Sequence, residues 1–181
     1  MSGFRIDVDI GDLGMDQLAD GAEAAVRPAA QAGSQVFYEA VKANAAGLGR
    51  TTGRLASSIY QVYSRDNSGP ARAEYHVSWN RKKAPHGHLV EFGHLQRYVT
   101  YIDKRGQWRT LVRPNMVGKP KPKRNAPQAV KDAYYVPLKG GPRIVGAKSF
   151  VRKAMSPQIA RQARNAMVDR FWFELERLGL L

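Results

Sequence analysis

The sequence of 181 residues contains no cysteine. Disulfide frameworks, zinc sites built on thiolates and cysteine nucleophiles are therefore excluded. The sequence also lacks any apolar run close to the ~20 residues that a membrane-spanning helix requires. Its first residues do not follow the basic-then-apolar layout of a secretory signal, so we expect a cytoplasmic origin. With 43% hydrophobic and 24% charged residues, the chain can still bury a substantial core.

Motifs that carry enzyme chemistry are missing as well. There is no Gly-x-Ser-x-Gly elbow, no phosphate loop that ends in Gly-Lys-Ser or Gly-Lys-Thr, and no Gly-x-Gly-x-x-Gly turn after a strand. Between residues 81 and 153 the only carboxylates are Glu91, Asp103 and Asp132. Because hydrolytic chemistry needs several acidic or metal-binding groups to converge, we expect no enzyme activity, no catalytic residue and no cofactor.

Acidic residues are scarce in the middle of the chain, although the whole chain has 29 Lys and Arg against 15 Asp and Glu. Residues 81–153 hold 18 basic and three acidic residues, whereas residues 1–80 have a net charge of −2 and residues 154–181 a net charge of +1. A concentrated block of positive charge predicts one face or arm that meets an anionic partner. The alternative is a solvated segment without a specific partner.

Hydrophobic periodicity predicts a long helix near each end of the sequence. Apolar residues recur at three- and four-residue steps between Leu13 and Leu48, which indicates an amphipathic helix whose Ala-rich stripe packs closely against another element. Pro28 predicts a kink, or two helices with Pro28 opening the second. Near the other end, Ser156 and Pro157 are typical of the N-cap and first position of a C-terminal helix.

Alternation with a period of two predicts strands, and turn residues separate them. The expected strands are residues 4–10, 58–65, 73–80, 98–102 and 108–112. A hairpin turn would join the last two strands. This order of elements is typical of an α+β fold, with a long N-terminal helix and a C-terminal helix packed on a small antiparallel sheet.

Residues 114–148 differ in composition from the rest of the chain. They hold six of the ten prolines and eight Lys or Arg, against one acid, Asp132. Each proline fixes φ and removes a hydrogen-bond donor, so an extended basic arm is predicted here. The one short helical turn that we expect lies within residues 126–135.

Three histidines and a carboxylate fall within nine residues, at His86, His88, Glu91 and His94. Imidazole and carboxylate groups can bind zinc. A helix would place His86 away from His88 and Glu91, and a strand would separate Glu91 from the two histidines, so neither regular element forms a compact site. Two interpretations stay open: a metal site on irregular backbone, and an ordinary turn in which Glu91 makes a local hydrogen bond or salt bridge.

Two sets of aromatic residues suggest contacts beyond the core. Trp172 and Phe173 lie off the apolar stripe of the predicted C-terminal helix, so they need cover from the arm, from another subunit or from the chain's own strands. The second set is interleaved with Lys and Arg, as in surfaces that stack on bases and pair with phosphates: Tyr98, Tyr101, Trp108, Tyr134 and Tyr135. Packing within the predicted hairpin explains this set equally well and is the interpretation that we prefer.

Three short blocks of the sequence resemble a family of small bacteriophage proteins. The blocks are Thr52-Gly-Arg-Leu-Ala-Ser-Ser-Ile59, Pro85-His-Gly-His-Leu-Val-Glu-Phe-Gly93 and Gly146-Ala-Lys-Ser-Phe-Val-Arg-Lys-Ala154. In order and approximate spacing they are similar to blocks of the neck and tail-completion proteins of long-tailed phages, also known as minor tail or head–tail joining proteins. The third block departs from the family pattern, because Gly146-Ala-Lys-Ser149 stands where the family usually carries prolines.

The resemblance covers about residues 13–94 and 143–178, and the intervening stretch is longer than the family needs. It therefore implies a core α+β domain of residues 1–94 and 142–181. Residues 95–141 would be an insertion that contains the hairpin and the Pro- and Lys-rich arm.

The resemblance also implies a function. The protein would be a structural virion protein, a ring-forming subunit of the head–tail connector or neck with a tail-completion or tail-terminator role, acting through protein–protein contacts around the DNA channel. Its expected partners are copies of itself in a hexameric or dodecameric ring, neighbouring connector, head-closure, tail-tube or tail-terminator proteins, and genomic DNA through non-specific contact in the lumen. Such a protein is expected in the virion, after assembly in the host cytoplasm, with no membrane partner.

Two sets of residues are candidates for these roles. The residues expected to contact another subunit or DNA are Arg113, Lys119, Lys121, Lys123, Arg124, Lys131, Lys139, Arg143, Trp172 and Phe173. The residues expected to maintain the structure of the blocks are Gly53, Arg54, Glu91, Phe92, Gly93 and Phe150. Among these, Gly53 and Gly93 would form backbone turns, and Arg54 would pair with Glu91.

Two alternatives to a ring subunit stay open. One is a DNA-binding protein that uses the basic residues 114–148. The other is a metal-dependent enzyme that uses His86, His88 and Glu91.

Overall fold

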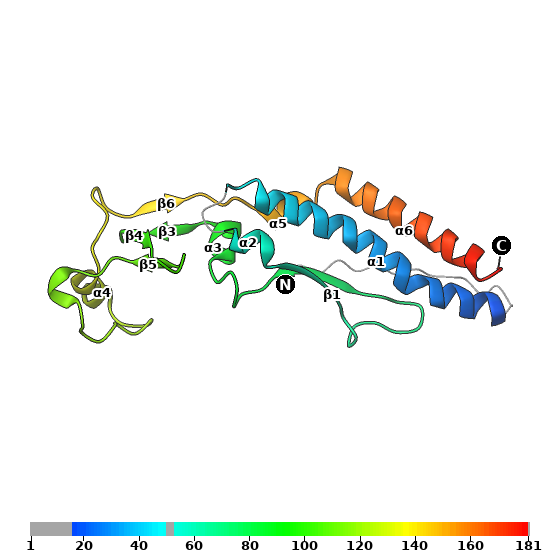
Figure 1. Cartoon of the computed structure of the whole chain (residues 1–181), viewed down its shortest axis with the longest axis horizontal. Helices are drawn as coiled ribbons and strands as arrows, with labels where there is room; N and C mark the ends of the chain where they lie inside the picture. The colour runs from blue at the N-terminus through cyan, green and yellow to red at the C-terminus, as the bar shows by residue number, and fades with distance from the viewer. Residues whose placement is uncertain (1–15, 50–52, 181) are drawn as a thin grey trace. The chain divides into compact units, whose positions relative to one another are not determined.

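The computed structural model describes residues 16–49 and 53–180. The backbone forms two compact units. Unit 1 contains the described residues up to Glu91 and those from Lys148 onward, and unit 2 is the stretch Phe92–Ala147. Helices and antiparallel strands occur together (Figure 1), which confirms the predicted α+β class. The strand predicted over residues 4–10 lies outside the described residues.

Unit 1 is built on α1 (Asp16–Ala46), the long helix that the apolar periodicity predicts. Pro28 lies inside α1, and the helix continues on both sides of it. The predicted alternative of two helices, with Pro28 opening the second, is therefore wrong. A proline within a helix costs about 3 kcal/mol. Tertiary packing offsets this cost, because the nearby Val26, Ala29 and Ala30 are all almost fully buried.

The second long helix, α6 (Pro157–Arg177), begins as the sequence predicts. The Ser156 hydroxyl accepts a hydrogen bond from the Ile159 N–H, and a proline occupies the first helical position. α6 lies side by side with α1 and runs in the opposite direction (Figure 1). Among the described residues, neither these two helices nor any shorter one combines the length and the apolarity of a membrane span.

Small residues allow α1 and α6 to approach closely. A Cβ built on Gly33 would collide with the Met167 side chain and would lie 3.2 Å from the Ala163 carbonyl oxygen. Ala163 is fully buried at this crossing. Near the other end of the pair, Ala22 and Ala25 of α1 pack against α6. The close packing expected of an Ala-rich stripe is therefore provided in part by α6.

A β-hairpin packs against α1 as well. β1 (Ile59–Tyr63) pairs antiparallel with β2 (Tyr75–Trp79), with Gln61 opposite Val77. Ala30 of α1 belongs to the same buried cluster as the start of β2. The helix α1 therefore contacts both α6 and the hairpin, which explains why so much of its surface is apolar.

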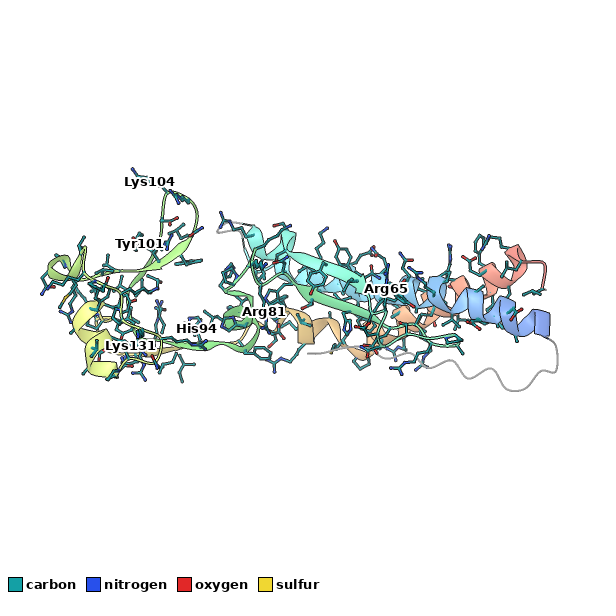
Figure 2. The ribbon with its side chains drawn as sticks, turned by 90° about the horizontal axis from the view of Figure 1, so that it is seen from below. Arg65, Arg81, His94, Tyr101, Lys104 and Lys131 are labelled. Atoms are coloured by element: carbon teal, nitrogen blue, oxygen red, sulfur yellow. The ribbon has the colours of Figure 1, made fainter. Side chains whose placement is uncertain are left out.

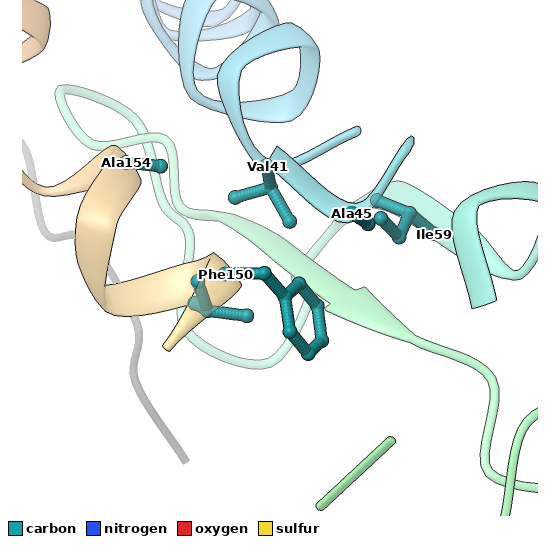
Figure 3. Packing of buried hydrophobic residues seen from close by; sticks show 6 residues of the cluster. Val41, Ala45, Ile59, Phe150 and Ala154 are labelled. Carbon is teal, nitrogen blue, oxygen red and sulfur yellow. The ribbon is translucent and has the colours of Figure 1, made fainter. Parts of the chain in front are cut away.

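Three short helices complete unit 1 near the C-terminal end of α1: α2 (Arg54–Ser57), α3 (Gly87–Phe92) and α5 (Phe150–Ala154). Phe150 is fully buried, and its ring meets the Trp79 ring edge-on at a centroid distance of 5.6 Å. The core cluster at this end consists of Val41, Ala45, Ile59, Phe150, Val151 and Ala154 (Figure 3).

Unit 2 contains two further pairs of antiparallel strands. β4 (Thr100–Ile102) and β5 (Trp108–Thr110) form the predicted hairpin around the turn at residues 103–107. β3 (His94–Gln96) pairs with β6 (Arg143–Val145), which the sequence did not predict, since the two short strands lie 47 residues apart at their closest and no hairpin turn joins them. The described strands thus form three separate two-stranded sheets instead of one small sheet.

The proline-rich part of unit 2 contains two short helical elements. These are the 3₁₀ turn η1 (Pro114–Met116) and the helix α4 (Gln128–Tyr134). The helical turn expected within residues 126–135 is therefore confirmed. Between η1 and α4 the chain forms neither helix nor strand, as the prolines predict.

Candidate interaction surfaces

Glu91 connects the second and third of the sequence blocks. It is only 2% exposed. Its carboxylate accepts hydrogen bonds from the backbone N–H of Val151 at 2.9 Å and of Arg152 at 3.2 Å, and from the Arg152 guanidinium at 3.3 Å. These N–H groups belong to the first turn of α5, where the helix leaves donors unpaired and favours a negative charge. Glu91 therefore anchors α5 to the end of α3.

The ion pair of Glu91 differs from the predicted one. We expected Arg54 as its partner, but the carboxylate pairs with Arg152, because α5 brings its own arginine to this position. The third block also forms a short helix of its own, α5. Met155 and Ser156 separate α5 from α6.

The two glycines assigned to backbone turns both have positive φ, 68° at Gly53 and 74° at Gly93. In the part of the chain that the structure describes, no atom beyond the adjacent residues lies within 4 Å of a Cβ built on Gly53, so the backbone conformation is what favours glycine there. A Cβ on Gly93 would lie 2.6 Å from the Val145 carbonyl oxygen and 2.8 Å from the Ala147 nitrogen. Position 93 therefore requires glycine both because φ is positive and because the backbone at Val145 and Ala147 leaves no room for a Cβ.

The described residues do not form the metal site that was one interpretation of the histidines. Both carboxylate oxygens of Glu91 are bound by α5. Partial burial, with the positive charge of Arg54 and then the neighbouring His88, lowers the pKa of His86. Within residues 16–49 and 53–180, no group of three His, Asp or Glu side chains could hold a metal ion. Glu91 does make a salt bridge, as the other interpretation expected, but its partner Arg152 lies 61 residues away and is not local.

The aromatic pair on α6 lies at the surface. Trp172 is 50% and Phe173 51% exposed, so the chain's own described strands do not bury either ring. The Trp172 ring meets the Phe171 ring edge-on at 6.0 Å, and the Arg170 guanidinium lies 5.1 Å from the centre of the Phe173 ring. Val168, one helical turn before Trp172, is 46% exposed. This face of α6 therefore presents large apolar side chains to solvent.

A buried carboxylate organises the arginines of the same helix. Glu174 is 2% exposed and contacts both Arg170 and Arg177, whose Nε donates to it at 2.8 Å. The hydrogen bond from Arg177, together with the charge of Arg170, lowers the pKa of the Glu174 carboxyl. Glu174 thus holds the Arg170 guanidinium close to Phe173.

Unit 2 carries most of the net charge. It has 12 Lys and Arg but only two acids, Asp103 and Asp132, so it accounts for +10 of the total of +14. Asp103 accepts hydrogen bonds from the Gln107 N–H at 2.8 Å and from Arg109 at 3.0 Å, and Asp132 accepts one from the Tyr98 hydroxyl at 2.7 Å. These bonds lower the pKa of both carboxyls. Both acids therefore serve the internal structure of unit 2.

The predicted basic arm is held against α4 by two hydrogen bonds. The Tyr134 hydroxyl donates to the Lys119 carbonyl oxygen at 3.0 Å, and the Lys131 ammonium donates to the Arg124 carbonyl oxygen at 2.7 Å. We call residues 119–124 the basic loop. Its four basic side chains are all exposed: Lys119, Lys121, Lys123 and Arg124.

Two of the other predicted contact residues are used inside unit 2. Arg113 Nε donates to the carbonyl oxygens of Asp132 and Tyr135 at 3.1 and 3.2 Å. Arg143 Nε donates to the side-chain oxygen of Gln96 at 3.0 Å, across the β3–β6 pair. The guanidinium groups of Arg113 and Arg143 therefore stabilise the internal structure of unit 2.

The aromatic set of unit 2 divides into two groups. The rings of Tyr98, Tyr134 and Tyr135 pack on one another, with centroid distances of 5.2 and 4.9 Å. These three residues therefore pack between segments of unit 2 and not within the β4–β5 hairpin, so the preferred interpretation of packing within the hairpin is wrong. Tyr101 and Trp108, on the β4–β5 hairpin, are instead 47% and 50% exposed.

Sequence reasoning missed some of the contacts that position these surfaces. Arg152 lies within the third block, which marked it as a residue of interest. Only the fold shows that it pairs with Glu91. Gly87 is buried beneath the Trp79 indole, and a Cβ built there would collide with that ring. A glycine between two histidines gives no sign of a tryptophan that lies beside it in space.

Comparison with known families supports the resemblance. Residues 13–93 match a family model described as "Bacteriophage HK97-gp10, putative tail-component". This confirms the resemblance to a family of phage tail proteins for that part of the chain, and it supports a structural component of the phage tail, within the virion. The match ends at the start of unit 2. No curated protein and no solved structure matches the chain.

Proposed function

We propose that this phage tail component is a ring-forming subunit of the head–tail connector, or neck, with a tail-completion or tail-terminator role. Copies of the chain associate through unit 1 into a hexameric or dodecameric ring around the DNA channel. The ring joins neighbouring connector or head-closure proteins to tail-tube or tail-terminator proteins, and the role involves no catalysis.

The exposed aromatic face of α6 is the observation that carries this proposal. Trp and Phe are enriched at the centre of protein interfaces, where they contribute most of the binding energy. Trp172 and Phe173 are half exposed, and Val168 extends the same helix surface. A face of this kind, presented to a different surface of the next copy, produces the head-to-tail contact that closes a ring.

The packing of unit 1 supports this use of α6. An interface holds its geometry best when it stands on a rigid element. α6 is fixed against α1 by the close contact at Gly33 and Ala163, and Glu91 fixes the segment that leads into it. The aromatic face therefore keeps one orientation in every copy.

The test is the mass of the full chain by light scattering. The wild type is expected to form a hexamer or a dodecamer, alone or when isolated heads or tails are added. The double variant Trp172→Ser/Phe173→Ser is expected to stay monomeric with unchanged circular dichroism.

The matched control is Tyr60→Ser, which removes an aromatic ring that is 41% exposed on β1 of the same unit. This variant should assemble like the wild type. A wild type that stays monomeric alone and with heads and tails, or a double variant that assembles normally, would contradict the proposal.

A further inference from the structure

The basic side chains of unit 2 differ in what they contact. Arg109, Arg113 and Arg143 bind oxygens within the unit, as described above. The basic loop differs: across the described part of the chain, no ion pair joins Lys119, Lys121 or Lys123 to a carboxylate. The basic loop therefore presents exposed positive charge that no described carboxylate neutralises.

The basic loop is also held in place before any partner binds. Pro120 and Pro122 separate its lysines and restrict the backbone between them. The hydrogen bonds to the carbonyl oxygens of Lys119 and Arg124 fix both ends of the loop to α4. A loop that is restrained in this way loses little conformational entropy on binding, so an anion would meet a surface that is already arranged.

The β4–β5 hairpin adds a second exposed element to unit 2. Ile102 pairs with Trp108, and Tyr101 with Arg109, so each face of the two-stranded ribbon carries an aromatic ring. Lys104 lies in the turn at its tip (Figure 2). Two-stranded ribbons are narrow enough to enter a groove of duplex DNA, and lysine beside an aromatic ring suits a phosphate-lined surface.

We propose that unit 2 binds the phosphate backbone of double-stranded DNA without base-sequence preference, mainly through Lys119, Lys121 and Lys123. An acidic protein surface is the competing partner, but Lys is depleted in protein–protein interfaces, whereas protein–DNA interfaces are much more positively charged. The inference does not depend on the ring proposal, because the basic loop belongs to unit 2 and the aromatic face of α6 belongs to unit 1.

The experiment measures binding of the full chain to labelled duplexes of two unrelated sequences, between about 50 and 200 mM salt. The wild type is expected to bind both duplexes with similar affinity, and the affinity should fall steeply as salt rises. The variant Lys119→Gln/Lys121→Gln/Lys123→Gln should show a shallower salt dependence. The negative slope of log K against log salt should become smaller in magnitude by about 2.7, since each lost phosphate contact removes about 0.9.

Two further variants test the role of charge. Lys119→Arg/Lys121→Arg/Lys123→Arg keeps the charge and should bind like the wild type. Arg65→Gln/Arg161→Gln/Arg164→Gln removes the same charge from exposed positions of unit 1 and should keep most of the slope. Light scattering on every variant reports ring formation separately, so a failure of either proposal is seen independently of the other.

Four results would overturn the inference. The first is no DNA binding by the wild type at the lowest salt, and the second is unchanged DNA binding by the basic-loop Gln variant. The third is a loss of DNA affinity in the unit 1 control equal to that in the basic-loop variant. The fourth is displacement of DNA by polyglutamate as effectively as by unlabelled duplex of equal charge. The last result would point to an acidic protein as the partner.

Discussion

A single buried carboxylate, Glu91, holds together segments that lie 60 residues apart in the sequence. We predict that Glu91→Ala lowers the free energy of unfolding by about 2–3 kcal/mol, because the buried N–H groups of Val151 and Arg152 lose their acceptor. Chemical denaturation measures the change. Glu176→Ala, which removes an exposed carboxylate, should lower it by less than about 0.5 kcal/mol. Equal effects of the two substitutions would show that Glu91 does not anchor α5.

The two turn glycines give a matched pair. We predict that Gly53→Ala costs about 1 kcal/mol, because only the left-handed conformation opposes a side chain there. Gly93→Ala should cost more, since its Cβ would lie within 3 Å of the backbone at both Val145 and Ala147. Thermal unfolding measures the loss of stability of the whole protein, and amide hydrogen exchange in β3 and β6 measures the loss of stability close to Gly93. Equal destabilisation by the two substitutions would contradict this account of Gly93.

Sequence patterns predict residues well when the cause is local. The turn roles of Gly53 and Gly93 and the Ser156 cap depend on neighbours in the chain. The partner of Glu91 could not be predicted in the same way, because the choice between Arg54 and Arg152 depends on where α5 lies in the fold.

At the scale of elements, the contact between α1 and α6 determines how the aromatic face is supported. We predict that Ala163→Leu lowers the free energy of unfolding by about 2–3 kcal/mol, because the larger side chain has no space beside Gly33. Ala160→Leu, at an exposed position of the same helix, should have little effect in the same denaturation measurement. A neutral Ala163→Leu substitution would mean that the two helices are not closely packed.

The pH dependence of α6 follows from Glu174. Its pKa is lowered from 4.5 by the hydrogen bond from Arg177 and the charge of Arg170. The ionised Glu174 carboxylate therefore stabilises the folded protein fully above pH 4.5, and this stabilisation is lost as the pH falls through the lowered pKa. We predict that Glu174→Gln lowers the Tm at neutral pH and that its difference from the wild type shrinks on acidification. Glu176→Gln is the control at an exposed position. If the Tm difference between Glu174→Gln and the wild type grows in acid, the stabilising role of the ionised Glu174 is contradicted.

Element prediction succeeded where periodicity is long. The helices α1 and α6 follow patterns of several repeats, the two hairpins are each joined by a recognisable turn sequence, and the existence of α4 follows from the interruption of the proline-rich run. The pair β3 and β6 could not be predicted, because each strand's partner lies far along the chain and no turn sequence joins the two. The continuity of α1 through Pro28 was also beyond a local pattern, since tertiary packing on both sides of the proline maintains the helix.

At the scale of the whole molecule, the two units differ in what they offer. The family match lies almost entirely within unit 1, which carries the helix pair and the exposed aromatic face. Unit 2 carries +10 of the net charge and holds its basic loop in place with Tyr134 and Lys131. The sequence showed where the charge is concentrated, but only the structure shows that both acids of unit 2 are engaged internally and that the loop is restrained. This separation suits a protein that assembles through one unit and contacts its surroundings through the other.

The location of the protein in the assembled particle tests the central claim most directly. An epitope tag on the full chain, incorporated into infectious phage and detected with gold-labelled antibody by electron microscopy, would show where the protein lies. The account predicts label at the junction of head and tail in purified virions, at a constant number of copies per particle. Absence of the protein from purified virions, or label spread along the tail, would contradict it.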